Sequence, residues 1–299
     1  MENLRLLFDA PVLSVQLLLD GILIGAIFAL AAYGMMLVWG VLNIINVAQG
    51  ELVMLGGYVA FYLYKAGINP LFGVPVAAAL LFVVGWALYR VVIFRIVDKD
   101  LFISILATFG LSILIQQLAK VAFSPDVRTP QTGFGTISLF SGAVTVTWIK
   151  IIAFGAALAT GGVLVWFLRA SRMGQAIRAT AQNARAARVM GIDTDRVYAW
   201  TFGVNAAICG ASGALVAMTY LVDPYIGLPY TIRSFMIVIV AGLGNISAVL
   251  ATALGLGAAE NVAAFLFGAE YQIAFVYGLL VAILVSRRMW LARQRRYLS

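Results

Sequence analysis

The chain has 299 residues, of which 63% are hydrophobic and only 11% are charged, and its mean hydropathy is +1.01. Soluble domains carry about 25% charged residues, so we expect an all-α polytopic membrane protein that forms one transmembrane domain over residues 1–299. The net charge of +8 reports membrane topology and predicts no nucleic-acid partner, because no basic–aromatic RNA-binding motif is present.

The first expected span covers residues 12–40, since about 20 apolar residues cross the hydrocarbon of a bilayer. Polar residues interrupt the next hydrophobic segment, 42–64; they are Asn43, Asn46, Gln49 and Glu51. Polar groups at membrane depth cost free energy unless they face protein or water. We therefore expect a broken or re-entrant segment near 43–51 that lines a cargo path. In the alternative interpretation, the two asparagines only cap a helix at the membrane boundary.

Further spans are expected at residues 72–94 and 101–119. In the second of these, Ser104, Thr108 and Ser112 are spaced by four residues and so share one helix face. Two interpretations stay open for this face. It makes hydrogen bonds between helices, or Ser104 and Thr108 line a weakly polar part of the cargo path.

Residues 121–147 contain prolines, glycines and an alternating apolar pattern, which predicts an extracytoplasmic loop with a small hairpin or a short interfacial segment. A span follows at 148–168. The polar interval 169–197 then predicts a basic helix from Gly174 to Met190, with an apolar stripe that includes Val189 and Met190 and a stop at Gly191. Such a helix can serve a cytoplasmic partner, and the alternative is a solvated positive loop.

The second half continues with a span at 198–220. The hydrophobic run 231–250 is broken by glycines and Asn245, so we expect a second broken or re-entrant segment near 242–246. A short helix at 252–267 and a last span at 271–286 complete the chain. The range is about 8–10 transmembrane helices.

Basic residues cluster at 90–99, 169–196 and 287–296. By the positive-inside rule these segments are cytoplasmic, which places the C-terminus in the cytoplasm. Nine crossings would then place the N-terminus outside. We expect a multi-pass protein of a bacterial-type cytoplasmic (inner) membrane, embedded in the lipid bilayer.

Several kinds of chemistry are missing from the sequence. There is no histidine, the single Cys209 cannot form an internal disulfide, and no Walker A motif is present. We expect no catalytic residues, no metal and no cofactor. The few ionisable residues in the spans, Glu51, Arg233 and Glu260 among them, mark no coupling-ion site. These absences suit a pore-forming subunit that receives energy from another chain.

Four ordered stretches carry a family resemblance. They are GILIGAIFALAAYGMMLVWGVLNIINVAQGELVMLGGY (21–58), SILATFGLSILIQQLAKVAFSPDVRTP (104–130), MGQAIRATAQNARAARVMGI (173–192) and VDPYIGLPYTIRSFMIVIVAGLGNI (222–246). With them, nearly the whole chain resembles the LivH type of branched-chain amino acid ABC transporter permease.

The resemblance implies a non-enzymatic importer subunit that translocates a branched-chain amino acid or a similar small polar solute. The implied partners are a LivM-like permease or a second copy of this chain, two ATP-binding ABC subunits, and an extracytoplasmic solute-binding protein. The segment 169–197 would be the cytoplasmic coupling element. Its expected ATPase-coupling residues are Gly174, Arg178, Arg185, Arg188 and Gly191.

The sequence departs from the family pattern at several positions. The family commonly has His where this chain has Gln49, and Asp where it has Asn183. It also favours a Gly-Ala-Val-Leu-Gly-Gly run at residues 247–252. Cargo therefore stays open, with urea, short amides and aromatic or carboxylic acids as alternatives. A standalone secondary carrier or channel is the other class, and a membrane-bound enzyme has little support.

Overall fold

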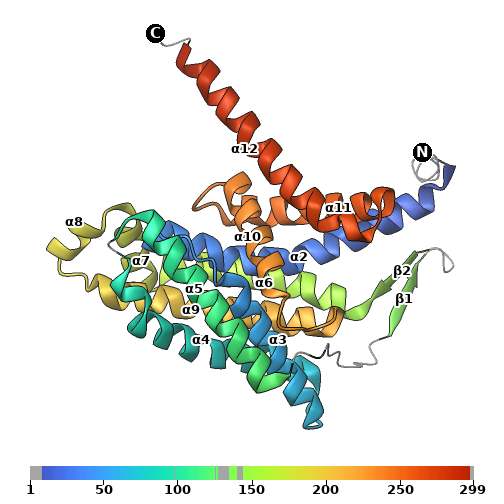
Figure 1. Ribbon diagram of the computed structural model, residues 1–299, viewed down its shortest axis with the longest axis horizontal. Helices are drawn as coiled ribbons and strands as arrows, with labels where there is room; N and C mark the ends of the chain where they lie inside the picture. Colours follow the sequence, from blue (N-terminus) through green and yellow to red (C-terminus); the bar gives the residue numbers. More distant parts are fainter. Residues whose placement is uncertain (1–8, 98, 125, 127–134, 140–143, 297–299) are drawn as a thin grey trace.

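The computed structural model describes residues 9–97, 99–124, 126, 135–139 and 144–296. It shows a helical bundle with one short β-hairpin (Figure 1). The helices are α2 (Pro11–Leu42), α3 (Gln49–Lys65), α4 (Gly73–Val91), α5 (Leu101–Phe123), α6 (Trp148–Ala170), α7 (Arg172–Gln182), α8 (Ala184–Val189), α9 (Thr194–Thr219), α10 (Gly227–Ala241), α11 (Ile246–Phe267) and α12 (Gln272–Arg296), with 3-10 turns η1 (Pro70–Phe72), η2 (Ile93–Arg95) and η4 (Ala269–Tyr271).

Among the described residues, 7 helical stretches are long and apolar enough to cross a membrane. They contain α2, α4, α5, α6, α9, α11 and the apolar part of α12. Two further helices, α3 and α10, are shorter, with 17 and 15 residues. Both of them adjoin a break, as expected for the interrupted segments. The architecture is an all-α polytopic membrane protein.

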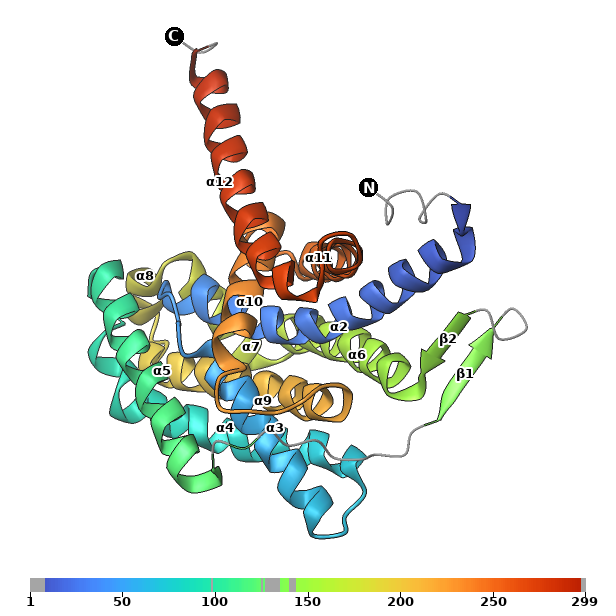
Figure 2. The same cartoon turned by 45° about the vertical axis from the view of Figure 1, so that its right-hand side comes forward.

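The core of the bundle is built on α2 and α9. In each, 83% of the most apolar window is buried, whereas the windows of α4, α5 and α6 are 22–28% buried. The outer helices therefore present most of their apolar surface outward, as lipid-facing helices do, since lipid tails are as apolar as leucine. Helix α12 extends away from the bundle in both views (Figures 1 and 2).

The hairpin and the segment α7–α8 lie at opposite ends of the bundle (Figures 1 and 2). Strands β1 (Thr136–Leu139) and β2 (Val144–Thr147) pair antiparallel, with Thr136 opposite Thr147. Of the two alternatives expected for 121–147, the structure thus shows the small hairpin. Residues 127–134 and 140–143 of that loop lie outside the described residues.

Both predicted breaks are present. Helix α2 ends at Leu42, and Asn43 caps it in the left-handed conformation at φ 53°. The second break separates α10 from α11, where Gly242 and Gly244 take φ angles of 82° and 88°. Residues with side chains rarely adopt these angles, so glycine suits the sharp turn.

Two boundary predictions were wrong. The single helix over 174–190 is two helices, because the backbone at Asn183 is extended and its side chain accepts a hydrogen bond from the Ala186 N–H, which starts α8. Helix α11 begins at Ile246 rather than at residue 252, because Asn245 caps it there. The last expected span, 271–286, agrees with the apolar stretch Ala269–Ser286, and α12 continues beyond it to Arg296, since the basic tail consists mostly of good helix formers.

Candidate functional site

The first break returns the chain into the interior of the bundle. Gln49, the first residue of α3, lies with its Nε2 3.0 Å from the carbonyl oxygen of Ala31. Ala31 is about three turns before the end of α2, or roughly 16 Å along its axis. The segment 43–48 therefore folds back along α2, and α3 begins near the middle of the bundle.

The beginning of α3 is held by side chains from other helices. The first N–H groups of a helix have no partner within it, and α3 has no side-chain cap of its own at Ala48. Thr231 Oγ1 of α10 instead accepts the Gly50 N–H at 2.8 Å, and Thr108 Oγ1 of α5 accepts the Val47 N–H at 3.1 Å. Three elements are thus fixed to one another at this point.

Polar side chains continue this network into α9 and α5. Gln49 Nε2 lies 2.9 Å from Asn205 Oδ1, and Asn46 Nδ2 donates to Gln49 Oε1 at 3.3 Å. Ser112 Oγ donates to Glu51 Oε1 at 3.0 Å. We call this set the central polar cluster; it consists of Asn46, Gln49, Glu51, Thr108, Ser112, Asn205 and Thr231.

Glu51 is the acid of the central polar cluster. The residue is 1% exposed, and its second oxygen, Oε2, has no hydrogen-bond partner among the described residues. The backbone of α10 approaches it so closely at Gly227 that a Cβ there would lie 2.6 Å from the carboxylate. A carboxyl group at this depth is expensive and is functional by default.

The structure brings together five of the seven predicted path residues. Asn46, Gln49, Glu51 and Thr108 belong to the central polar cluster, and Ser104 is buried one turn before Thr108, whose hydroxyl donates to its carbonyl oxygen. The other two, Asn43 and Asn245, are exposed helix caps. For Asn43, the capping interpretation is therefore the one that the structure favours.

Three members of the cluster were not among the predicted path residues. Asn205 and Ser112 are polar residues within apolar spans, and Ser112 lies on the same face as Ser104 and Thr108. That shared face was the available signal. Thr231 could not be found in this way, because it is the first residue of the hydrophobic run 231–250 and does not interrupt it.

A second buried polar group lies between α10 and α11. Arg233 Nε and Nη2 bind the Glu260 carboxylate at 2.9 Å and 3.0 Å, and Gln272 donates to the same carboxylate at 3.2 Å. Glu260 is thus paired with Arg233, and it does not pair with Glu51. No group of three or more His, Cys, Asp or Glu residues that could hold a metal exists within the described ranges.

The predicted coupling segment lies at one end of the bundle. Gly174 packs against the end of α6, where a Cβ would meet the Phe167 carbonyl oxygen, and Ile177 is buried. The predicted arginines Arg178, Arg185 and Arg188 are exposed, and the Nε of Arg188 donates to Thr194.

At the C-terminal end of α8, the two residues expected in the apolar stripe are exposed. Val189 and Met190 are 87% and 81% exposed, because the break at Asn183 redirects α8. Gly191 follows at φ 83°, where glycine allows the helix to stop. The result is an exposed apolar tip beside exposed arginines.

Comparisons with known proteins agree with this architecture. The family model described as "Branched-chain amino acid transport system / permease component" matches residues 17–284. The LivH permease proteins of Salmonella typhimurium and Escherichia coli are each 32% identical over 290 residues, covering 90% of this chain and 92% of theirs. BraD of Pseudomonas aeruginosa is 30% identical over 288 residues, covering 91% and 93%.

No solved structure matches the chain significantly. The family match covers nearly all of the chain, including both breaks, the central polar cluster and the segment α7–α8. The relatives are aligned over almost their full length. The chain therefore belongs to the family of branched-chain amino acid transport permease components and is a multi-pass membrane permease subunit of an ABC importer.

Proposed function

We propose that this permease subunit carries a branched-chain amino acid or a similar small polar solute, delivered by an extracytoplasmic binding protein and driven by ATP hydrolysis on partner subunits. The main support is the return of the chain at 43–48, which places polar groups near mid-depth in the bundle. The names of the relatives favour this cargo over urea, short amides and aromatic or carboxylic acids.

The proposed cargo path runs beside the central polar cluster. The residues that we place on it are Asn46, Gln49, Glu51, Ser104 and Thr108, whereas Asn43 and Asn245, also expected from the sequence, are exposed helix caps. Support comes from the burial of Glu51 with an unpaired oxygen and from the contacts between α3, α5, α9 and α10 at this point. A change in the spacing of these helices would alter the partners of the same polar groups, which is how a rocking transporter exposes a site.

The proposed ATPase contact is the segment α7–α8. Its residues are Gly174, Arg178, Arg185, Arg188 and Gly191. Exposed arginines beside the apolar tip at Val189 and Met190 suit a groove with acidic rims on an ATPase. The tight packing of Gly174 on α6 would transmit motion of that contact to the bundle as a rigid body.

The proposed assembly contains two ABC ATPase subunits and a second permease, either LivM-like or another copy of this chain. The C-terminus and α7–α8 would be cytoplasmic. The N-terminal end of α2 would be extracytoplasmic, which is supported by its position opposite α7–α8 (Figure 1). The membrane would be the bacterial-type cytoplasmic membrane.

Affinity purification in mild detergent, followed by uptake in proteoliposomes, tests the proposal. We expect a Walker A ATPase and a permease to co-purify, and labelled leucine to enter only with ATP and the binding protein. Recovery of this chain alone, with uptake that follows an ion gradient, would contradict the proposal and favour a secondary carrier.

Charge reversal tests the ATPase contact. Changing Arg178, Arg185 and Arg188 to Glu should reduce ATPase recovery and uptake together. The control is Lys65→Glu, an exposed cation at the end of α3, which should change neither. Intact recovery and uptake in the triple variant would show that these arginines only set topology.

A further inference from the structure

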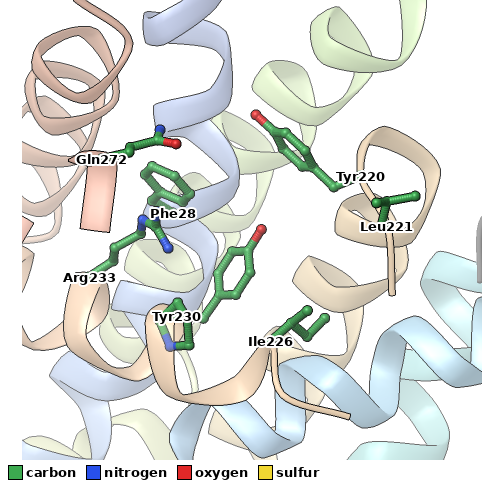
Figure 3. A pocket seen from close by; sticks show the side chains of 8 residues that line it. Phe28, Tyr220, Leu221, Ile226, Tyr230, Arg233 and Gln272 are labelled. Carbon is green, nitrogen blue, oxygen red and sulfur yellow. The ribbon is translucent and has the colours of Figure 1, made fainter. Parts of the chain in front are cut away.

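A pocket of about 240 Å³ lies beside α10, and none of its lining residues belongs to the central polar cluster. Figure 3 shows how the surrounding side chains lie. The wall is formed by Phe28 of α2, by Tyr220, Leu221 and Ile226 of the loop between α9 and α10, by Pro229, Tyr230 and Arg233 of α10, and by Gln272 of α12. At about 30 Å³ for each water, the volume is that of roughly eight water molecules, which suits a small amino acid.

Among the residues that the structure describes, Arg233 is the single charged one that lines this pocket. Its guanidinium lies between the rings of Phe28 and Tyr230, 4.9 Å and 5.7 Å from their centres (Figure 3). Glu260 binds Nε and Nη2, so the guanidinium is fixed in direction. Arginine has five N–H donors, and within the described part of the chain Nη1 makes no hydrogen bond.

The charge that faces the pocket is therefore positive. Glu260 is 1% exposed and does not line the pocket, and both Arg233 and Gln272 donate to its carboxylate. An incoming cation would find no free carboxylate on this wall, because that of Glu260 already accepts from Arg233 and Gln272. An incoming carboxylate would find a preoriented guanidinium, and bonds between arginine and carboxylate are among the strong charge-assisted ones.

The rest of the wall combines apolar side chains with the polar groups of Tyr220, Tyr230 and Gln272. Leu221 and Ile226 lie across the space from the guanidinium, whereas Phe28 lies beside it (Figure 3). Burial of apolar surface from water is favourable. A solute with a carboxylate at one end and an aliphatic or aromatic side chain at the other therefore matches both parts of the pocket.

We propose that this pocket is a binding site for the cargo, in which Arg233 pairs with the carboxylate and Leu221 and Ile226 contact the apolar side chain. The inference rests on the proposed function, since it names the cargo class as small apolar amino acids. Glu260 is a positioning residue in this scheme. It holds the guanidinium and does not touch the cargo.

A cysteine-protection experiment tests the pocket directly. The natural Cys209 is fully buried, so an introduced Leu221→Cys is a selective target for methyl methanethiosulfonate in membranes containing the assembled complex. Leucine should slow this labelling, by about threefold at twice its dissociation constant, because labelling follows the unoccupied fraction. Leucinol, which lacks the carboxylate, should not slow it.

Tyr225→Cys is the matched control. It lies in the same loop and is 57% exposed, against 58% for Leu221, but it does not line the pocket. Leucine should leave its labelling rate unchanged. Equal protection of Leu221→Cys by leucinol, or no protection by saturating leucine, would overturn the proposal. Both results are obtained with the Arg233–Glu260 ion pair intact.

A charge-neutral variant tests the role of the guanidinium. In Leu221→Cys, the added changes Arg233→Gln and Glu260→Gln should abolish protection by leucine. Neutralising a second inter-helix pair, Lys150 with Asp20 at 2.8 Å, should leave protection intact. Protection that survives loss of the first pair would refute the assignment.

The result is independent of the transport assay. ATP-driven leucine uptake with no protection at Leu221→Cys would refute the pocket as a cargo site and leave the proposed function standing. Protection in a complex that shows no ATP-driven uptake would support leucine binding in the pocket and contradict the proposed function.

Discussion

The contact between α3 and α10 at Gly50 offers a sharp test of how the central polar cluster is held. A Cβ on Gly50 would lie 1.7 Å from the carbonyl oxygen of Gly227 and 2.8 Å from Thr231 Oγ1. Real Cβ atoms essentially never lie closer than 3.0 Å to such atoms. In Gly50→Ala, α10 must therefore move away from α3 by about 1.3 Å, because backbone cannot rotate aside as a flexible side chain can.

The movement has a cost that can be worked out. Thr231 Oγ1 now accepts the Gly50 N–H at 2.8 Å and donates to the Val47 carbonyl at 3.0 Å. Overpacking costs about 1–3 kcal/mol and each lost hydrogen bond about 1 kcal/mol, so we expect a loss of about 3–5 kcal/mol. At roughly 2–4 °C per kcal/mol for chains near this size, the midpoint of unfolding should fall by roughly 10 °C.

The assay is thermal unfolding of the purified complex, with ATP-driven uptake beside it. Gly110→Ala in α5 is the matched control, because a Cβ there meets nothing within 4 Å, and it should leave the midpoint unchanged or slightly higher. Thr231→Val separates the two contributions, since it removes the hydroxyl without moving α10 and should cost about 1–3 kcal/mol. A Gly50→Ala complex that melts and transports like Gly110→Ala would refute this account of the contact.

Two further variants probe the cluster and the coupling segment. Glu51→Gln keeps an acceptor for Ser112 but removes the acid, so uptake should fall at least several-fold while the unfolding midpoint stays near that of the wild type; unchanged uptake would remove Glu51 from the path. Asn183→Ala removes the acceptor of the Ala186 N–H, which should cost about 1 kcal/mol at the start of α8. Hydrogen exchange in residues 184–189 should become faster and ATPase recovery lower, and exchange equal to that of Asn183→Ser would argue against a capping role.

Much of the fold could be predicted from the lengths of the apolar stretches and from the glycines and polar residues that interrupt them. The spans at 72–94, 101–119 and 148–168 match α4, α5 and α6, because about 20 apolar residues suffice to cross a bilayer. The division at Asn183 was missed, since the residues on both sides are good helix formers. Only the extended backbone at that asparagine shows that capping is stronger than propensity there.

The site was predictable only in part. Polar residues inside an apolar run are visible in the sequence, so Asn46, Gln49 and Glu51 could be predicted as site residues. Their partners could not be named, because the sequence does not say that the chain at 43–48 folds back beside Ala31. The pairing of Glu260 with Arg233 likewise depends on how α10 and α11 pack across the break at Gly242.

Helix α10 connects the two polar regions of the molecule. Thr231 binds the start of α3, and Arg233, two residues later and roughly 200° around the helix, lines the pocket. The helix is continuous over its 15 residues, and Gly242 and Gly244 adjoin its end with nothing within 4 Å of their Cβ positions. A movement of α10 that frees Glu51 from Gly227 must therefore also displace Arg233 relative to Phe28, so the central polar cluster and the pocket cannot change independently.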